Sequence, residues 1–94
     1  MALEVVYSDR AQETLRLTYN LISFKFGIKA ANDFSNKAER TIRLIAFQPY
    51  MYKASTIDAD VRIATITRQT SLFYFVADTK VILLFFFDNR QEPL

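Results

Sequence analysis

The sequence predicts an α+β domain with the element order β-α-α-β-β-β, in which a helical hairpin packs on one face of a largely antiparallel sheet. Two observations support this class. Apolar residues recur at steps of three or four over residues 9–26 and 29–47, which is the period of an amphipathic helix. After residue 60, the chain changes to short segments rich in Val, Ile, Thr and Phe, which favour strands.

The first strand and the first helix are predicted from a β-branched stretch followed by a capping residue. Residues 3–7 favour a strand, and Ser8 occupies the N-cap position of a helix over residues 9–26. Gly27 is the only glycine in the chain, and it stands where a C′ residue adopts the left-handed conformation. We therefore expect Gly27 to separate two helices.

A second helix and three more strands complete the predicted order. The helix over residues 29–47 is ended by Gln48 and Pro49, because proline cannot continue a helix. The three strands are expected at residues 61–67, 72–76 and 80–87, with hairpin connections at residues 68–71 and 77–79.

Length and composition exclude several classes of protein. A chain of 94 residues has the size of one small domain, so we expect residues 1–94 to form a single core. The absence of cysteine and histidine excludes disulfide scaffolds, zinc fingers, thiol nucleophiles and imidazole bases. A single glycine excludes a Gly-rich phosphate loop. We predict neither a metal nor a cofactor.

Charge and hydropathy also limit the kinds of partner that the protein can have. The N-terminal residues lack the pattern of a secretory signal, and the longest apolar run has seven residues, far fewer than the roughly 20 that span a bilayer. We therefore expect a cytoplasmic protein without a membrane partner. The net charge is only +2 and there is no basic tail, which predicts little direct DNA binding.

The last two predicted strands are apolar on both faces. Residues 81–87 contain no polar side chain, and residues 73–75 read Phe-Tyr-Phe. Two helices cover only one face of a sheet, so the second face is closed either by loops and neighbouring side chains or by a partner protein. A bare, uncharged run of high β-propensity is prone to aggregation, and a permanently bound chain would relieve this.

The cations around the sheet are the candidates for contacts with anions. In its predicted strand, Arg62 shares the parity of Ala64 and Ile66, and we expect it to reach the face that the helices leave open. Its guanidinium either pairs with a nearby carboxylate, such as Asp58 or Asp60, or contacts a phosphate. These two aspartates are otherwise expected in a solvated turn.

Five parts of the chain carry a likeness to a known family. They are Tyr7-Ser8-Asp9-Arg10-Ala11, Phe47-Gln48-Pro49, Arg62, Thr67-Arg68-Gln69-Thr70-Ser71-Leu72-Phe73-Tyr74 and Phe87-Asp88-Asn89-Arg90-Gln91-Glu92-Pro93. None is specific alone. Together with the element order, they resemble the RelE/ParE superfamily of toxins from bacterial type II toxin–antitoxin systems, and in particular small ParE-like toxins of Bacteroidetes. The likeness covers nearly the whole chain.

The resemblance implies a growth-inhibiting toxin of a plasmid stabilisation or addiction system. A cognate antitoxin, which commonly has a DNA-binding part of its own, would wrap around the toxin and hold it inactive in a hetero-oligomer. ParE-like members inhibit DNA gyrase without a recognisable catalytic centre, whereas RelE-like members cut mRNA on the ribosome. The ending Phe85-Phe86-Phe87-Asp88 lacks the Tyr or His that RelE-like members use. We therefore expect a gyrase inhibitor that is not an enzyme.

Two alternatives remain, a ribosome-dependent mRNA endoribonuclease and an inactive antitoxin-binding co-repressor module. For the endoribonuclease, the phosphate-binding candidates are Arg62, Arg68 and Lys53. For antitoxin binding, the candidates on the last two strands are Phe73, Tyr74, Phe75, Leu83, Phe85 and Phe87. Four residues are expected to have structural roles, namely Gly27, Pro49, Asp88 and Arg90, with Arg90 fastening the chain end and Asp88 available as its partner.

Overall fold

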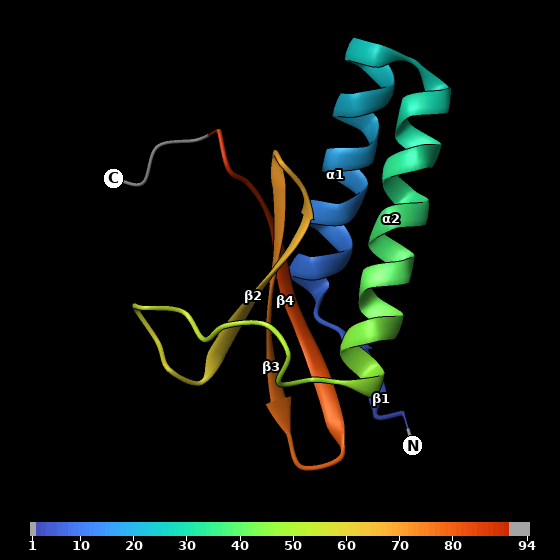
Figure 1. Ribbon diagram of the computed structural model, residues 1–94. Coiled ribbons are helices and arrows are strands. Elements are labelled where there is room, and N and C mark those ends of the chain that lie inside the picture. The colour runs from blue at the N-terminus through green and yellow to red at the C-terminus, as the bar shows by residue number, and fades with distance from the viewer. Residues whose placement is uncertain (1, 91–94) are drawn as a thin grey trace.

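The computed structural model describes residues 2–90, and its elements follow the predicted order (Figure 1). The chain folds as β1 (Glu4–Tyr7), α1 (Asp9–Phe26), α2 (Ile28–Phe47), β2 (Val61–Thr67), β3 (Thr70–Ala77) and β4 (Lys80–Asp88). Both predicted helices and the predicted strands are therefore confirmed. Their bounds differ from the prediction by at most about two residues at an end, which is the usual uncertainty of helix and strand termini.

The strands form one sheet in the order β1-β4-β3-β2. The pairs β4–β3 and β3–β2 are antiparallel, whereas β1 lies parallel to β4. Both helices lie on one side of this sheet, and within residues 2–90 no helix covers the other side (Figure 1). The predicted class, a helical hairpin on one face of a largely antiparallel sheet, is confirmed.

A single residue, Gly27, joins the two helices. Gly27 has φ 97° and ψ 166°, and it serves as the C-cap of α1 and the N-cap of α2. The positive φ agrees with the prediction, but this ψ lies far from the left-handed helical value and in a region that only glycine adopts readily. Gly27 therefore ends one helix and begins the next with no residue between them.

The core lies between α2 and the inner face of the sheet. Seven residues of α2 are buried, which are Ala31, Phe34, Ala38, Thr41, Ile42, Ile45 and Ala46. Most of them pack with the inward side chains of the sheet, which are Ala64, Ile66, Leu72, Tyr74, Val81, Leu83 and Phe86. By contrast, Ala11 is the only buried residue of α1. The first helix therefore keeps much of its apolar surface available.

The β2–β3 turn is shorter than predicted. Arg68 and Gln69 form the turn, and β3 begins at Thr70. The polar composition of residues 68–71 predicts a longer loop, but Thr70 and Ser71 are each only 5% exposed and pair with the end of β4. Backbone hydrogen bonds to β4 hold these two residues in the strand, although their side chains are polar.

Within the described part of the chain, no helix has both the length and the apolarity to cross a membrane.

Candidate functional site

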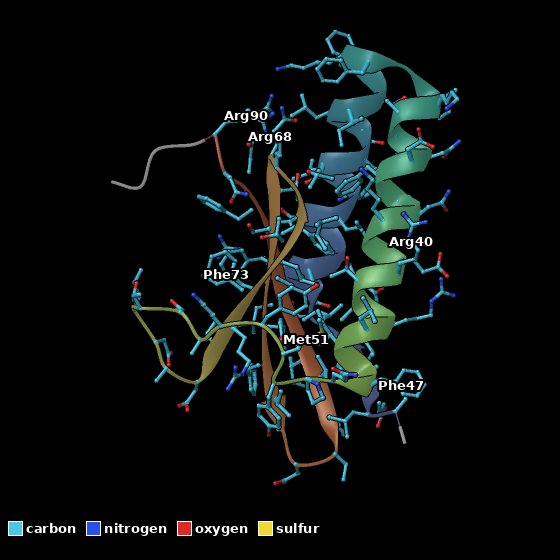
Figure 2. The ribbon with its side chains drawn as sticks, viewed as in Figure 1. Arg40, Phe47, Met51, Arg68, Phe73 and Arg90 are labelled. Atoms are coloured by element: carbon cyan, nitrogen blue, oxygen red, sulfur yellow. The ribbon has the colours of Figure 1, made fainter. Side chains whose placement is uncertain are left out.

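The sheet face opposite the helices carries a cluster of phenylalanine rings. The rings of Phe73 and Phe85 stack with centroids 4.6 Å apart, and Phe87 meets Phe73 edge-on at 6.0 Å. Phe73 projects away from both helices (Figure 2), and Phe75 follows at the spacing that keeps both on one face. The guanidinium of Arg10, from α1, lies 4.9 Å from the Phe85 ring centroid. We call these four phenylalanines the aromatic cluster.

Two of the residues predicted to bind an antitoxin point into the core instead. Tyr74 and Leu83 have no exposed surface and belong to the core under the helices. In β4 the cause is a β-bulge, since Phe73 pairs with Phe85 whereas Tyr74 pairs with Leu83. The extra residue, Leu84, interrupts the alternation of inward and outward side chains along the strand. Neither Tyr74 nor Leu83 is accessible to a partner, so these two predictions are wrong and only the four phenylalanines remain candidates.

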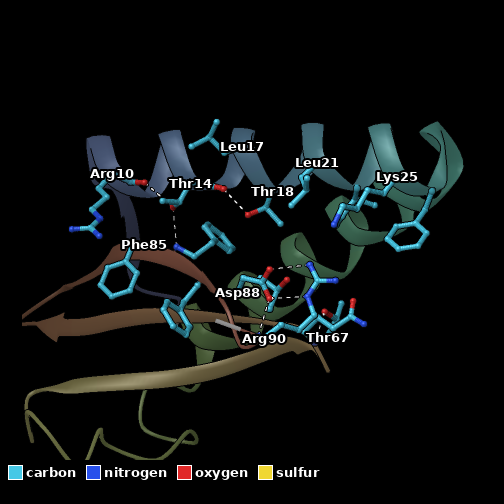
Figure 3. Close-up of a pocket in the computed structure, with 16 residues that line it drawn as sticks. Arg10, Thr14, Leu17, Thr18, Leu21, Lys25, Thr67, Phe85, Asp88 and Arg90 are labelled. Atoms are coloured by element: carbon cyan, nitrogen blue, oxygen red, sulfur yellow. Dashed lines mark hydrogen bonds and ion pairs between the residues drawn. The ribbon is translucent and has the colours of Figure 1, made fainter. Parts of the chain in front are cut away.

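A groove of about 340 Å³ lies between α1 and the second half of β4 (Figure 3). Because β1 pairs only with residues 80–83, the rest of that strand edge faces α1. Thr14 Oγ1 accepts a hydrogen bond from Phe86 N at 2.9 Å, and Ser8 Oγ donates one to Leu84 O at 2.8 Å. These helix side chains satisfy part of an edge that would otherwise be open to another strand.

The groove is lined on its helix side by leucines and threonines of α1, and basic side chains lie at its ends, where Asp88 pairs with Arg90. Leu17 and Leu21 of α1 are 53% and 42% exposed along it. Arg10 lies at one end, and Lys25 and Arg90 lie toward the other (Figure 3). The groove was not predicted from the sequence, although the additional apolar positions Leu17 and Leu21 of α1 are a signal for it.

The end of β4 is fastened to the β2–β3 turn by Asn89. The backbone N of Asn89 donates to Gln69 O at 2.7 Å, and its side-chain amide donates to Arg68 O at 3.3 Å. Arg90 instead forms the expected ion pair with Asp88, at 2.9 Å. The hydrogen bond from Arg90 holds the pKa of Asp88 below its usual value. Asn89 therefore has the fastening role that was predicted for Arg90. The ion pair of Arg90 joins it only to Asp88, two residues earlier.

Arg62 is held by the loop between α2 and β2. It lies on the same side of β2 as Ala64 and Ile66, which are buried beneath the helices. Its guanidinium donates to Tyr52 O at 2.6 Å and lies 4.9 Å from the centroid of the Tyr50 ring. The prediction that Arg62 reaches the open face is therefore wrong, and backbone carbonyls take the place of the expected carboxylate partner.

Of the three phosphate-binding candidates, Arg68 lies apart from the other two. Lys53 lies in the α2–β2 loop beside Arg62, because its carbonyl accepts a hydrogen bond from Ile63 N at 3.1 Å and its neighbour Ala54 pairs with Arg62. Arg68 lies in the β2–β3 turn (Figure 2), roughly 20 Å from Arg62 at about 3.3 Å per strand residue. In residues 2–90, the acidic side chains also form no group of three that could hold a metal ion.

The phenol of Tyr74 has a structural role. It donates a hydrogen bond to Pro49 O at 2.7 Å, which ties the segment after α2 to the sheet. Burial raises the pKa of Tyr74 to about 12, so the phenol stays protonated near neutral pH. Tyr74 therefore acts as a donor to the backbone and is unsuited to act as a general base.

No family model and no curated protein sequence matches this chain, but several solved structures share its arrangement, and three of them follow. A protein of the chromosomal ParDE toxin–antitoxin system from P. aeruginosa superposes with a TM-score of 0.78, at 13% identity over 93% of this chain and 96% of that chain. A chain of the RelBE2 toxin–antitoxin complex from Mycobacterium tuberculosis has a TM-score of 0.57, 16% identity and coverage of 95% and 100%. A copper-bound mutant toxin from Helicobacter pylori has a TM-score of 0.59, 19% identity and coverage of 93% and 94%.

The chain has the RelE/ParE-like fold. Within this fold, the helix start at Ser8 and the helix end before Pro49 lie where the resemblance implies. Arg62 occupies the expected strand but faces the loop. The last residues that carry the resemblance, Gln91, Glu92 and Pro93, lie outside the described residues.

Proposed function

We propose that this chain is the cytoplasmic toxin of a type II toxin–antitoxin system, that a cognate antitoxin holds it inactive, and that its target is DNA gyrase. The observation that carries the proposal is the shared fold with the ParDE protein, at a TM-score of 0.78 over 93% of the chain. Because identity is only 13%, the site itself has to supply the further support.

The antitoxin would cover the aromatic cluster. Its four rings lie on the sheet face that carries no helix within residues 2–90, and stacked aromatic side chains are common anchors of protein interfaces. A segment of the antitoxin lying on this face would remove the apolar surface from water. It would also protect the strands from pairing with other chains.

The groove between α1 and β4 extends this surface around the sheet edge. Arg10 links the two regions, because it lines the groove and also lies over the Phe85 ring. A wrapping segment would therefore leave the aromatic cluster past Arg10 and continue along Leu17 and Leu21. Such a segment would fold as it binds, which lets one chain cover a large surface.

Gyrase is the favoured target because the cations do not build a site for phosphate cleavage. Arg62 is occupied by carbonyl oxygens, and Arg68 lies roughly 20 Å away along the strand at about 3.3 Å per residue. The buried phenol of Tyr74 is committed to Pro49 O. A non-enzymatic inhibitor requires none of these groups to converge.

One observation favours the endoribonuclease alternative. The stacked Phe73 and Phe85 rings with the Arg10 guanidinium above them form the kind of platform on which unpaired bases stack. If the chain instead cleaves mRNA with Arg62 bound to the scissile phosphate, replacing Arg62 with Ala should abolish cleavage and leave antitoxin binding nearly unchanged. If the Arg62→Ala variant still cleaves mRNA, Arg62 has no role in the cleavage mechanism.

The deciding experiment is pulse labelling immediately after the chain is induced without its antitoxin. Thymidine and methionine incorporation are followed in parallel, and co-expression of the antitoxin serves as the control. We expect thymidine incorporation to fall first, because gyrase inhibition stops replication. Inhibition of supercoiling by purified gyrase would then confirm the target.

Other outcomes would contradict the proposal in different ways. If methionine incorporation falls first, the target is the ribosome and the gyrase assignment fails. If neither falls while the antitoxin still binds tightly, the chain is an inactive co-repressor module.

A further inference from the structure

The connection between α1 and α2 presents large apolar side chains to solvent at the far end of the molecule. Phe24, Phe26 and Ile28 are 88%, 64% and 59% exposed. We call residues 24–29 the hairpin tip. It projects past the β2–β3 turn (Figure 1), and Phe73 of the aromatic cluster lies away from it (Figure 2). Burial of the core does not explain these side chains, since none of them belongs to it.

The hairpin tip is held in one conformation. Gly27 N donates to Ser23 O at 3.0 Å, and Gly27 O accepts from Ala31 N at 3.2 Å. Further along, Tyr19 Oη donates to Asn32 Oδ1 at 2.7 Å and ties α1 to α2. A connection of one residue between two helices leaves little freedom. The apolar side chains are therefore preorganised for a partner of fixed shape, which lowers the entropic cost of binding.

The charge of the hairpin tip has one sign. Among residues 19–32, the only charged side chains are Lys25 and Lys29. The side chain of Lys29 is 90% exposed, and its pair with Asp33 is long, at 3.4 Å. An apolar centre flanked by cations fits an apolar pocket with carboxylates at its rim.

We propose that the hairpin tip is the element that contacts the target, and that Phe24 and Ile28 enter an apolar pocket with an acidic rim on gyrase. This inference rests on the proposed function. It assigns target recognition to a surface distinct from the aromatic cluster. The groove ends at the hairpin tip, because Lys25 and Phe26 are among its lining residues. An antitoxin in the groove would thus lie beside the tip and obstruct its approach to gyrase.

The test compares two double variants of the full chain, both at exposed apolar positions. The first, Phe24→Ser with Ile28→Ser, changes the hairpin tip. The matched control, Leu44→Ser with Phe47→Ser, changes side chains that are 49% and 64% exposed near the other end of α2. Inhibition of supercoiling by purified gyrase is measured for each. Antitoxin affinity and thermal unfolding are measured in parallel to show that both variants fold.

We expect the tip variant to need at least about tenfold more protein for the same gyrase inhibition, since buried aromatic anchors dominate interfaces. Its antitoxin affinity and the inhibition by the control variant should match wild type. Reversing the charges of Lys25 and Lys29 to Glu should weaken inhibition further, and more strongly at low salt.

Several results would overturn the inference. Full inhibition by a folded tip variant would refute it alone and leave the proposed function standing. A wild-type chain that does not inhibit gyrase would refute the target as well. Two further outcomes would assign the tip to another partner, provided that the tip variant still inhibits gyrase. If wild type binds phosphatidylglycerol vesicles and the tip variant does not, the partner is a membrane. If wild type self-associates and the tip variant does not, the partner is a second copy of the chain.

Discussion

Replacing Tyr74 with Phe tests how the segment after α2 is held on the sheet. The change keeps the ring in the core but removes the hydrogen bond to Pro49 O. Leaving that carbonyl without its donor should cost about 1–2 kcal/mol near neutral pH. For a domain of this size, each 1 kcal/mol lowers the midpoint of thermal unfolding by about 4–8 °C.

At high pH, the same substitution should reduce the loss of stability that wild type shows as the pH rises. The folded protein keeps the Tyr74 proton until its pKa of about 12, whereas the unfolded chain releases it near 10.0. Between these values the unfolded state binds fewer protons, so the stability that burial of the neutral phenol contributes is complete below pH 10.0 and is lost toward pH 12. The loss is at most about 1.4 kcal/mol per pH unit. Tyr74→Phe should lack this part of the decline.

Urea unfolding of wild type and Tyr74→Phe near neutral pH and across the alkaline window measures both effects. Tyr7, whose pKa is also raised by burial, should account for some decline that remains in the variant. Tyr19→Phe is the control, because it removes an exposed hydrogen bond and should change stability by no more than about 0.5 kcal/mol. If wild type and Tyr74→Phe lose equal stability as the pH rises, the argument about the buried phenol is refuted.

Three further predictions follow from the fold and the site. Replacing Phe73 with Ala should weaken antitoxin binding at least about tenfold in a calorimetric titration, because it removes the centre of the aromatic cluster; unchanged affinity would exclude that face. Replacing Gly27 with Ala should cost about 1–3 kcal/mol of unfolding free energy, since φ is 97° there although no atom lies within 4 Å of the added methyl group. Thr14→Val should cost about 1–3 kcal/mol in thermal unfolding by leaving Phe86 N without its acceptor, and Thr14→Ser should restore most of it.

Local patterns in the sequence determined the elements of this protein. Ser8 caps α1 through a hydrogen bond from Ala11 N at 3.0 Å, and the helical period of residues 29–47 matches the buried stripe of α2. These features depend on residues within a few positions of one another, so they can be predicted without knowledge of the fold. The apolar character of β3 and β4 likewise predicted apolar side chains on the sheet face without a helix, and the phenylalanine rings that lie there are half-buried.

Pairing between distant segments decided the candidate site. The bulge at Leu84 places Leu83 in the core and Phe85 on the open face, although both share one parity in the sequence. The α2–β2 loop captures Arg62, and α1 contacts a strand edge 72 residues away through Thr14. The sequence by itself thus determined which residues form helices and strands. The face that each side chain occupies depended on register and on contacts across the fold, because one added residue in a strand reverses the direction of those that follow.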